Sequence, residues 1–188
     1  MAIQFGISSN FNLTTFAGSS FSFKYHFSQK IALRVIGSLS TSVYDIDLDR
    51  NYGETEQYSS DQNYNNYTIN VKLPIVYYPK PFHNATPYFG LGPLIEYSHR
   101  YAKISDTHTS DLDMGPEEER NLWHLGISGM AGAELFVQKN ISIHAEYFAL
   151  LYYRYLKETE NRNMKQTTKY NGYYLAGSHI YFGLSVYF

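Results

Sequence analysis

The chain has 188 residues, of which 17% are charged and 18% are aromatic, and its formal net charge at pH 7 is −2. This length suits a single domain covering residues 1–188, but the charged fraction lies well below the roughly one quarter typical of soluble domains. The near balance of charge excludes a strongly basic surface, so no nucleic-acid partner is expected, and the absence of cysteine excludes disulfides and thiolate metal sites.

Apolar residues recur at every second position from the start of the chain. Ile3 and Phe5 alternate with Gln4 and Gly6, a periodicity that is typical of strands and not of helices. In chain order, alternating segments cover residues 3–13, 20–27, 33–43, 67–77, 89–98, 123–135, 141–154 and 173–188. No run approaches the roughly eighteen consecutive apolar residues of a membrane helix. The mean hydropathy of −0.38 does not exclude a membrane protein, because a membrane β-barrel alternates its faces.

These segments predict an all-β fold, an eight-stranded antiparallel up-and-down transmembrane β-barrel. An even number of strands suits such a barrel, and at eight strands the side chains just fill the interior. In the last segment, the alternation places Tyr174 on the same apolar face as Ile180 and Phe182. Up to Val43 the apolar residues stand at odd positions, and from Tyr44 onward they stand at even positions. This change indicates a bulge or a strand that protrudes past the membrane.

The polar face indicates which side of the barrel wall faces outward. It carries mostly glycine, serine, asparagine and threonine, whereas a soluble barrel would expose many lysines and glutamates. Aromatic residues near the ends of the apolar segments suit interfacial girdles. We therefore expect lipid outside, around an interior polar network of Lys24, Arg34, Lys72, Glu96, Arg100, Glu134, Glu146 and Arg154. The alternative is a soluble barrel that carries an apolar ligand on an inward-facing apolar surface.

The connections between segments alternate in length. Those near residues 28–30 and 137–140 are short and the one near 79–87 is moderate, whereas those near 45–66, 104–121 and 157–168 are long and polar. Short turns on one side and long loops on the other are typical of outer-membrane barrels. We therefore expect short periplasmic turns, long extracellular loops and both termini at the periplasmic end.

The chain ends with a glycine followed by hydrophobic residues at the third-last and last positions: Gly183, Val186 and Phe188. With this ending and its eight segments, the chain resembles the small eight-stranded outer-membrane barrels of the OmpX, Ail and OmpA transmembrane-domain type. The resemblance implies that these three residues form the signal read by the barrel-assembly machinery, although Phe182 stands where the family often has a polar residue.

The same resemblance implies a location in the bacterial outer membrane. The expected partners are outer-membrane lipids, lipopolysaccharide and, during biogenesis, the barrel-assembly machinery, and the protein is expected to be a monomer. No secretory signal peptide stands before the first segment. We therefore expect Met1 to be a start residue added to a mature sequence.

No local motif for catalysis or metal binding stands out. His99 lies on the outward face without a serine two residues away, and Ser9 and Ser178 lie elsewhere on that face. His124 and His144 lie on neighbouring strands, but no two histidines have the spacing of a metal site. We therefore expect no enzyme activity, no cofactor and no metal. A narrow ion-conducting pore or a lipid A-modifying enzyme is the alternative.

The long connections are the candidate interaction sites, because most of the acidic residues lie in them. We predict that the protein acts through these charged loops as a structural, adhesion or surface-interaction protein, with a host or surface protein as a partner. The candidate binding residues are Tyr44, Asp45, Asp47, Asp49, Glu54, Glu56, Glu117, Glu118 and Glu119.

Overall fold

The computed structural model describes residues 1–12, 17–52, 56–79, 85–108, 111–113, 117–161 and 164–188. Within these ranges, the side chains of residues 8–12, 17–18, 47–52, 56–61, 104–108, 111–113 and 178–179 lie outside the description. In the part of the chain so described, no helix is long and apolar enough to cross a membrane.

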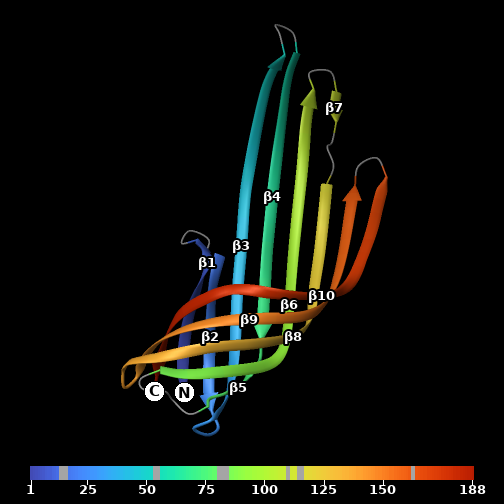
Figure 1. Cartoon of the computed structure of the whole chain (residues 1–188). Coiled ribbons are helices and arrows are strands. Elements are labelled where there is room, and N and C mark those ends of the chain that lie inside the picture. The colour runs from blue at the N-terminus through green and yellow to red at the C-terminus, as the bar shows by residue number, and fades with distance from the viewer. Residues whose placement is uncertain (13–16, 53–55, 80–84, 109–110, 114–116, 162–163) are drawn as a thin grey trace.

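The regular structure consists of β-strands (Figure 1). In chain order they are β1 (Ala2–Asn12), β2 (Ala17–His26), β3 (Ile31–Tyr52), β4 (Glu56–Lys72), β5 (Ile75–Tyr77), β6 (Ala85–His108), β7 (Asp111–Asp113), β8 (Glu117–Gln138), β9 (Ile141–Asn161) and β10 (Lys165–Tyr187).

Eight strand positions close into a ring. β1, β2, β3, β4, β6, β8, β9 and β10 pair in this order, always antiparallel, and β10 pairs again with β1. The chain ends meet at one end of the ring, where Phe188 N donates to Met1 O over 3.0 Å. We call this the turn end and the opposite end the hairpin end. The ring confirms the predicted all-β antiparallel architecture with eight strand positions.

β5 continues the line of β4 around the ring, so the predicted segment 67–77 forms two strands. Pro74 lacks a backbone N–H and interrupts the ladder, together with Leu73. Backbone hydrogen bonds from Arg34 N to Pro74 O and from Leu73 N to Pro93 O, each 3.0 Å, still join the interrupted strand to β3 and β6. The wall of the ring is therefore continuous through the break.

Beyond the ring, at the hairpin end, the paired strands continue as an open wall formed by β3, β4, β6, β8, β9 and β10 (Figure 1). β2 pairs with β3 only as far as Phe21↔Gly37, and β1 pairs with β10 only as far as Ile7↔Phe182, whereas β3 and β4 stay paired up to Tyr52. Among the residues that the structure describes, β3 and β10 are therefore the two unpaired edges of this wall. The regions 45–66, 104–121 and 157–168, predicted as loops, lie mostly in strands. That prediction was wrong because these regions are rich in polar residues, and alternation of apolar residues was the signal used to find strands.

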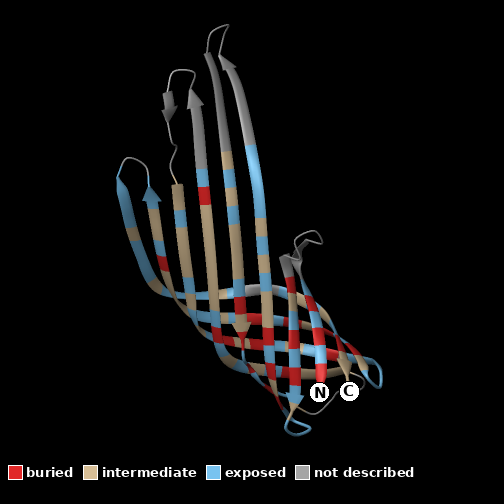
Figure 2. Ribbon diagram, turned by 180° about the vertical axis from the view of Figure 1, so that it is seen from behind, coloured by how far each residue is buried: buried red, intermediate tan, exposed pale blue. Residues whose placement is uncertain are grey.

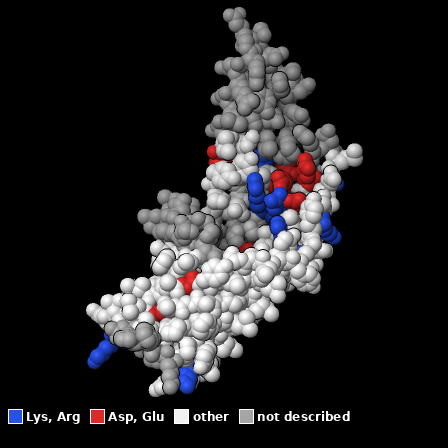
Figure 3. Space-filling view, viewed as in Figure 1, with Lys and Arg blue, Asp and Glu red and all other residues white. Residues whose placement is uncertain are grey.

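Buried and exposed residues alternate along the strands of the ring (Figure 2), and the two faces differ sharply in polarity. Large apolar side chains such as Phe21, Leu91 and Phe182 are 56–63% exposed on the outside. Lys24 and Arg34, by contrast, point inward and are 1% and 2% exposed. The space-filling view shows few charged atoms on the surface of the ring, whereas the described charges gather in a hollow beside the hairpin end (Figure 3).

Two details of the side-chain phase differ from the sequence prediction. A register shift in β10 between Gly177 and Ile180 reverses the faces, so that Tyr174 points inward and stacks on Tyr152 at 5.8 Å. The β3–β4 register, in contrast, runs without a shift past Val43, so there is no bulge there. The phase slip in the sequence reflects a strand that protrudes beyond the ring.

Gly126 marks a place where the strands approach too closely for a side chain. A Cβ there would collide with the backbone oxygen of Leu151 and with Tyr152 on β9. Glycine is therefore required for the strand contact between β8 and β9, at the level where the ring passes into the wall.

Candidate functional site

Two buried ion pairs cross the interior of the ring. Lys24 Nζ lies 3.2 Å from Glu134 Oε2, joining β2 to β8. Arg34 holds both carboxylate oxygens of Glu146, at 2.5 and 3.0 Å, and joins β3 to β9. In the order of the ring, β2 lies opposite β8 and β3 lies opposite β9. Both pairs therefore span the lumen from wall to wall.

Neighbouring hydroxyl groups complete the hydrogen bonding of the two carboxylates. Ser142 and Tyr187 donate to Glu134 Oε1, and Tyr88 donates to Glu146 Oε2 over 3.0 Å. Buried charges are stable only when they are paired and hydrogen-bonded in this way. The hydroxyl donors come from β6, β9 and β10, so the carboxylates tie several strands together.

The ammonium group of Lys24 also lies among three aromatic rings. Its Nζ is 5.4 Å from the centre of the Tyr78 ring, 5.7 Å from Tyr88 and 5.4 Å from Tyr187. Tyr187 in addition donates to Glu134 and lies 3.1 Å from Lys24 Nζ. The aromatic rings supply cation–π attraction and fill the lumen around the charge.

A chain of polar side chains runs from Arg34 around one side of the ring. Arg34 Nε donates to Ser22 over 3.0 Å, Ser22 donates to Gln4 over 2.8 Å, and Gln4 donates to Ser185 over 2.6 Å. Ser185 in turn contacts His144 Nδ1 at 3.1 Å. The strand registers place Gln4 directly opposite both Ser22 and Ser185, which explains why the chain can form.

A further layer lies toward the hairpin end. Asn70 donates to Glu96 over 2.7 Å, and His124 Nδ1 lies 2.8 Å from the other oxygen of Glu96. Lys72 Nζ stands 4.4 Å from the centre of the Phe148 ring. Polar side chains of this layer, such as Asn70, Glu96 and His124, thus bond to one another across neighbouring strands.

Arg100 and Arg154 point inward as well, but the structure does not bring them into the ion pairs. Arg100 lies over the Tyr64 ring at 5.4 Å, and Arg154 lies over the Tyr174 ring at 5.6 Å. No ion pair of either arginine is found among the described residues. Arg154 is in register with His124 and Glu96, and Arg100 lies four residues beyond Glu96 on β6, toward the hairpin end.

The predicted loop residues lie on strands where they are described. Tyr44 stacks on Tyr64 with ring centres 4.8 Å apart, and Asp45 is exposed beside it. Glu54 and the side chains of Asp47, Asp49 and Glu56 lie outside the description.

The three glutamates at the start of β8 each meet a neighbour. Glu117 pairs with Lys103 at 3.5 Å, Glu118 pairs with Arg120 at 3.5 Å, and Glu119 accepts from Asn121 over 2.8 Å. They form part of a paired rim at the hairpin end.

The residues of the predicted assembly signal lie at the turn end of β10. A Cβ on Gly183 would meet the His144 ring, so glycine makes room for that side chain. Val186 pairs with Ile3 across the β1–β10 junction, and Phe188 is 80% exposed. The terminal aromatic residue therefore stands free of the barrel wall.

One outward cluster was missed by sequence reasoning. Asn121 Oδ1 lies 2.9 Å from His99 Nδ1 and accepts from Tyr97 over 2.8 Å, while the amide nitrogen of Asn121 donates to Glu119. Within the described residues, the polar and ring partners of His99 include no serine or cysteine. The cluster was invisible in the sequence because its members come from β6 and β8 and meet only through the register.

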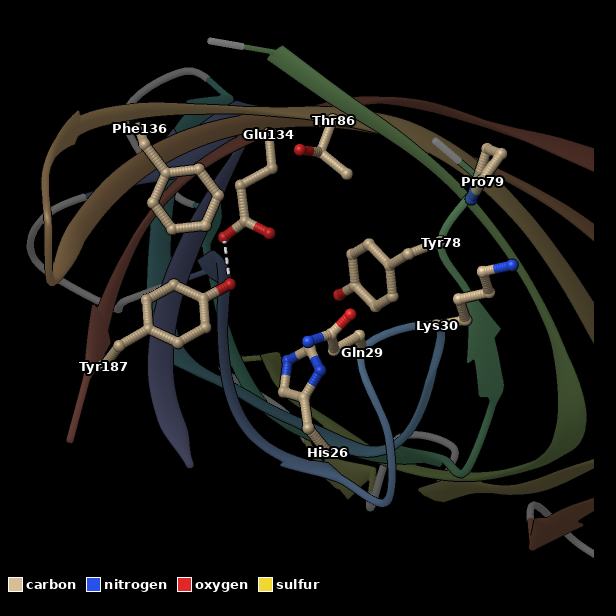
Figure 4. A pocket seen from close by; sticks show the side chains of 9 residues that line it. All are labelled: His26, Gln29, Lys30, Tyr78, Pro79, Thr86, Glu134, Phe136 and Tyr187. Atoms are coloured by element: carbon tan, nitrogen blue, oxygen red, sulfur yellow. Dashed lines mark hydrogen bonds between the residues drawn. The ribbon is translucent and has the colours of Figure 1, made fainter. Parts of the chain in front are cut away.

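A cavity of about 390 Å³ opens at the turn end of the lumen. Glu134 and Tyr187 lie at its inner side, and the rings of Tyr78, His26 and Phe136 line its walls (Figure 4). Within the described residues, Tyr78 Oη and His26 Nε2 are buried without a hydrogen-bond partner. A smaller cavity of about 80 Å³ lies further toward the hairpin end and is lined by residues of β2, β3, β4, β9 and β10. No group of three metal-ligating side chains gathers in the described part of the chain.

Comparisons with known proteins find fold-level similarities only. No family model and no curated protein matches the chain. Solved structures that are similar over the whole chain include Acinetobacter baumannii CarO (11% identity, TM-score 0.42, 97% of that chain covered) and CarO2 (10%, 0.45, 97%). A major outer membrane protein from Thermus thermophilus is similar at 11% identity and a TM-score of 0.46, with 98% of that chain covered. These similarities are too low to assign an activity, which is therefore argued from the geometry of the chain.

Proposed function

We propose that the protein is an integral outer-membrane β-barrel with a filled lumen, which acts at the cell surface as a structural, adhesion or surface-interaction protein. The observation that carries the proposal is the inverted polarity of the ring. Four charged side chains that span the lumen are 1–3% exposed, while phenylalanine, leucine and isoleucine cover the outside. In water such an exterior would aggregate, whereas in a bilayer it matches the solvent.

The same polarity argues against the soluble carrier of an apolar ligand. Such a carrier would need an apolar interior, but the centre of this ring holds the Lys24–Glu134 and Arg34–Glu146 pairs. The cavity at the turn end is bordered by Glu134 and by two unpartnered polar atoms. An apolar ligand would find no dry, apolar site there.

The short connections and both termini then belong on the periplasmic side, and the open wall belongs outside the cell. The wall offers two features to a partner: the charged rim on β8, and the free edges of β3 and β10. A free edge presents unpaired backbone groups, to which an extended segment of another protein can add as a strand. The lumen-spanning pairs leave the interior no evident catalytic role, so we assign the activity to this wall.

Gel mobility of detergent-refolded protein, with and without boiling, tests the membrane barrel. A closed membrane barrel resists SDS until it is heated, so we expect two bands, the faster of which disappears on boiling. The proposal fails if there is one band at both temperatures and the protein stays folded in buffer without detergent.

A further inference from the structure

The strand registers align five outward side chains in one row at the upper border of the apolar surface. Tyr67, His99, Asn121, Lys157 and Lys169 are direct cross-strand neighbours on β4, β6, β8, β9 and β10. The row immediately toward the turn end contains aromatic residues on three successive strands: Tyr97, Trp123 and Tyr155. A polar row therefore sits directly on an aromatic girdle.

Lys157 and Lys169 face each other in this row without a counter-charge. Both side chains are exposed, and no ion pair of either lysine is found in the part of the chain that the structure describes. Glu158 points to the opposite face and pairs with Arg120, and Glu119 on the same face holds Asn121. Two like charges directly opposite each other destabilise a strand pair, so an anion between them would stabilise it.

Beneath the two lysines lies the most exposed apolar surface of β10. Tyr173 and Leu175 are 82% and 81% exposed, and Leu151 on the neighbouring strand is 52% exposed. Tyr153 packs against Tyr173 with ring centres 5.3 Å apart. A ligand for this surface therefore has an anionic group at one end and an apolar chain that reaches toward the turn end.

We propose that Lys157 and Lys169 bind the phosphate of an anionic lipid whose acyl chains lie along Tyr173 and Leu175. The inference rests on the proposed membrane function, and it names the lipid class and the site. Charge complementarity selects the phosphate, and the adjoining apolar residues select a lipid over a free anion. The aromatic girdle places both lysines at headgroup level.

Trp123 provides the readout, because it is the only tryptophan in the chain and stands opposite Tyr155, two residues from Lys157. The refolded protein is placed in uncharged detergent micelles and titrated with phosphatidic acid brominated near the glycerol end of its acyl chains. Bromine quenches tryptophan fluorescence at short range, so bound lipid lowers the Trp123 emission. Phosphatidylcholine with the same brominated chains is titrated in parallel.

The variants K157Q and K169Q remove one charge each, and K157R and K169R keep it. We expect each glutamine variant to raise the phosphatidic acid concentration at half-maximal quenching, the midpoint, by roughly fivefold. The arginine variants should have the same midpoint as the parent protein. K139Q removes the same charge from the turn between β8 and β9, at the opposite end of the barrel. It is the matched control and leaves the midpoint unchanged.

The outcomes separate this site from the membrane barrel itself. Quenching by brominated phosphatidylcholine reports only that Trp123 faces lipid, and its absence would count against the membrane proposal. If phosphatidylcholine quenches but phosphatidic acid shows no preference, or K139Q shifts the midpoint as much as K157Q, only the lysine site is overturned. Displacement of phosphatidic acid by inorganic phosphate would also overturn it, because the site would then take free anions.

Discussion

At the residue level, Glu146 accepts three hydrogen bonds inside the lumen. It holds both nitrogens of the Arg34 fork and accepts from Tyr88. Its replacement by glutamine keeps the shape of the side chain but leaves the guanidinium of Arg34 without a counter-charge. Removing one partner of a buried pair is far more damaging than replacing both.

We therefore expect E146Q to lose about 3–5 kcal/mol in the free energy of unfolding. Urea titration of protein refolded into lipid vesicles measures it. The control E119Q removes a half-exposed carboxylate at the rim and should change stability by at most about 1 kcal/mol. The double variant R34M/E146L should recover most of the loss, and equal destabilisation by E146Q and E119Q would contradict the role given to the pair.

The terminal residue Phe188 allows a second test at this level. It is 80% exposed, and its backbone N–H donates to Met1 O. The phenyl side chain therefore adds little to the packing of the barrel strands. If it belongs to an assembly signal, F188A should lower the amount of barrel in the outer membrane of expressing cells by severalfold. The same variant should refold in detergent as well as the parent protein. Poor refolding would instead assign Phe188 a structural role.

Single residues also show where sequence reasoning reached its limit. Alternation placed Lys24, Arg34, Glu134 and Glu146 on one face, because a side-chain period of two follows from strand geometry alone. It could not pair them, since each partner lies on the opposite side of the ring and the pairing depends on how far the strands are staggered. The cluster of His99 with Asn121 depended on register in the same way.

At the level of the elements, the β3–β4 hairpin is the most extended part of the wall. Its strands pair from Ile36↔Lys72 up to Tyr52↔Glu56. The sequence indicated a protruding strand after Val43 but not its length, because beyond Leu48 the residues are mostly polar and no apolar alternation marks the period. Continuous backbone pairing joins β3 and β4 along the hairpin.

Shortening this hairpin tests the surface role. Val43 and Asn65 are direct cross-strand partners, so residues 44–64 can be replaced by an Asn-Gly turn without disturbing the ring. We expect the variant to show the same heat-dependent gel shift as the parent protein. If the protein acts in adhesion as proposed, the variant should also lose most of the adherence that the parent protein would give to expressing cells. The control replaces residues 159–167 at the tip of β9–β10, between the partners Glu158 and Thr168. Unchanged adherence in the β3–β4 variant would exclude that hairpin as the binding element.

At the level of the whole molecule, the lumen is closed by the two lumen-spanning pairs. Along β3, Arg34 lies between Lys30, which lines the larger cavity, and Ser38, which lines the smaller one. The buried layer therefore separates the two cavities. Eight strands leave just enough room for side chains, so no continuous water path is expected through this layer.

Planar-bilayer recording measures this closure. We expect no steady current from the parent protein, because an ion would have to displace a buried pair on its way through the lumen. Regular, ion-selective current steps would contradict the filled lumen and favour a narrow pore instead.

The separation of β2 from β3 also bears on the lipid around the barrel. Within the described ranges, β3 has no strand partner on its β2 side beyond Gly37, and the lining of the smaller cavity beside it includes Ser19, Ser20, Ser38 and Ser40. Unpaired backbone groups cannot lie in hydrocarbon, so water must reach this edge through the serines. On the opposite side, β8 and β9 are paired without a gap from Leu135↔Ile143 to Glu117↔Asn161.

In the proposed outer-membrane setting, the barrel is therefore wet along one seam and dry along the other, and we expect a thinner bilayer beside β3 than beside β8. Backbone amides of residues 38–43 that point away from β4 should exchange hydrogen for deuterium far faster than those of residues 125–135, although both segments are strands. A bilayer that thins on one side only exerts an uneven pull on the protein. The barrel axis then leans toward the seam, and the open wall does not stand upright on the membrane but inclines over its surface.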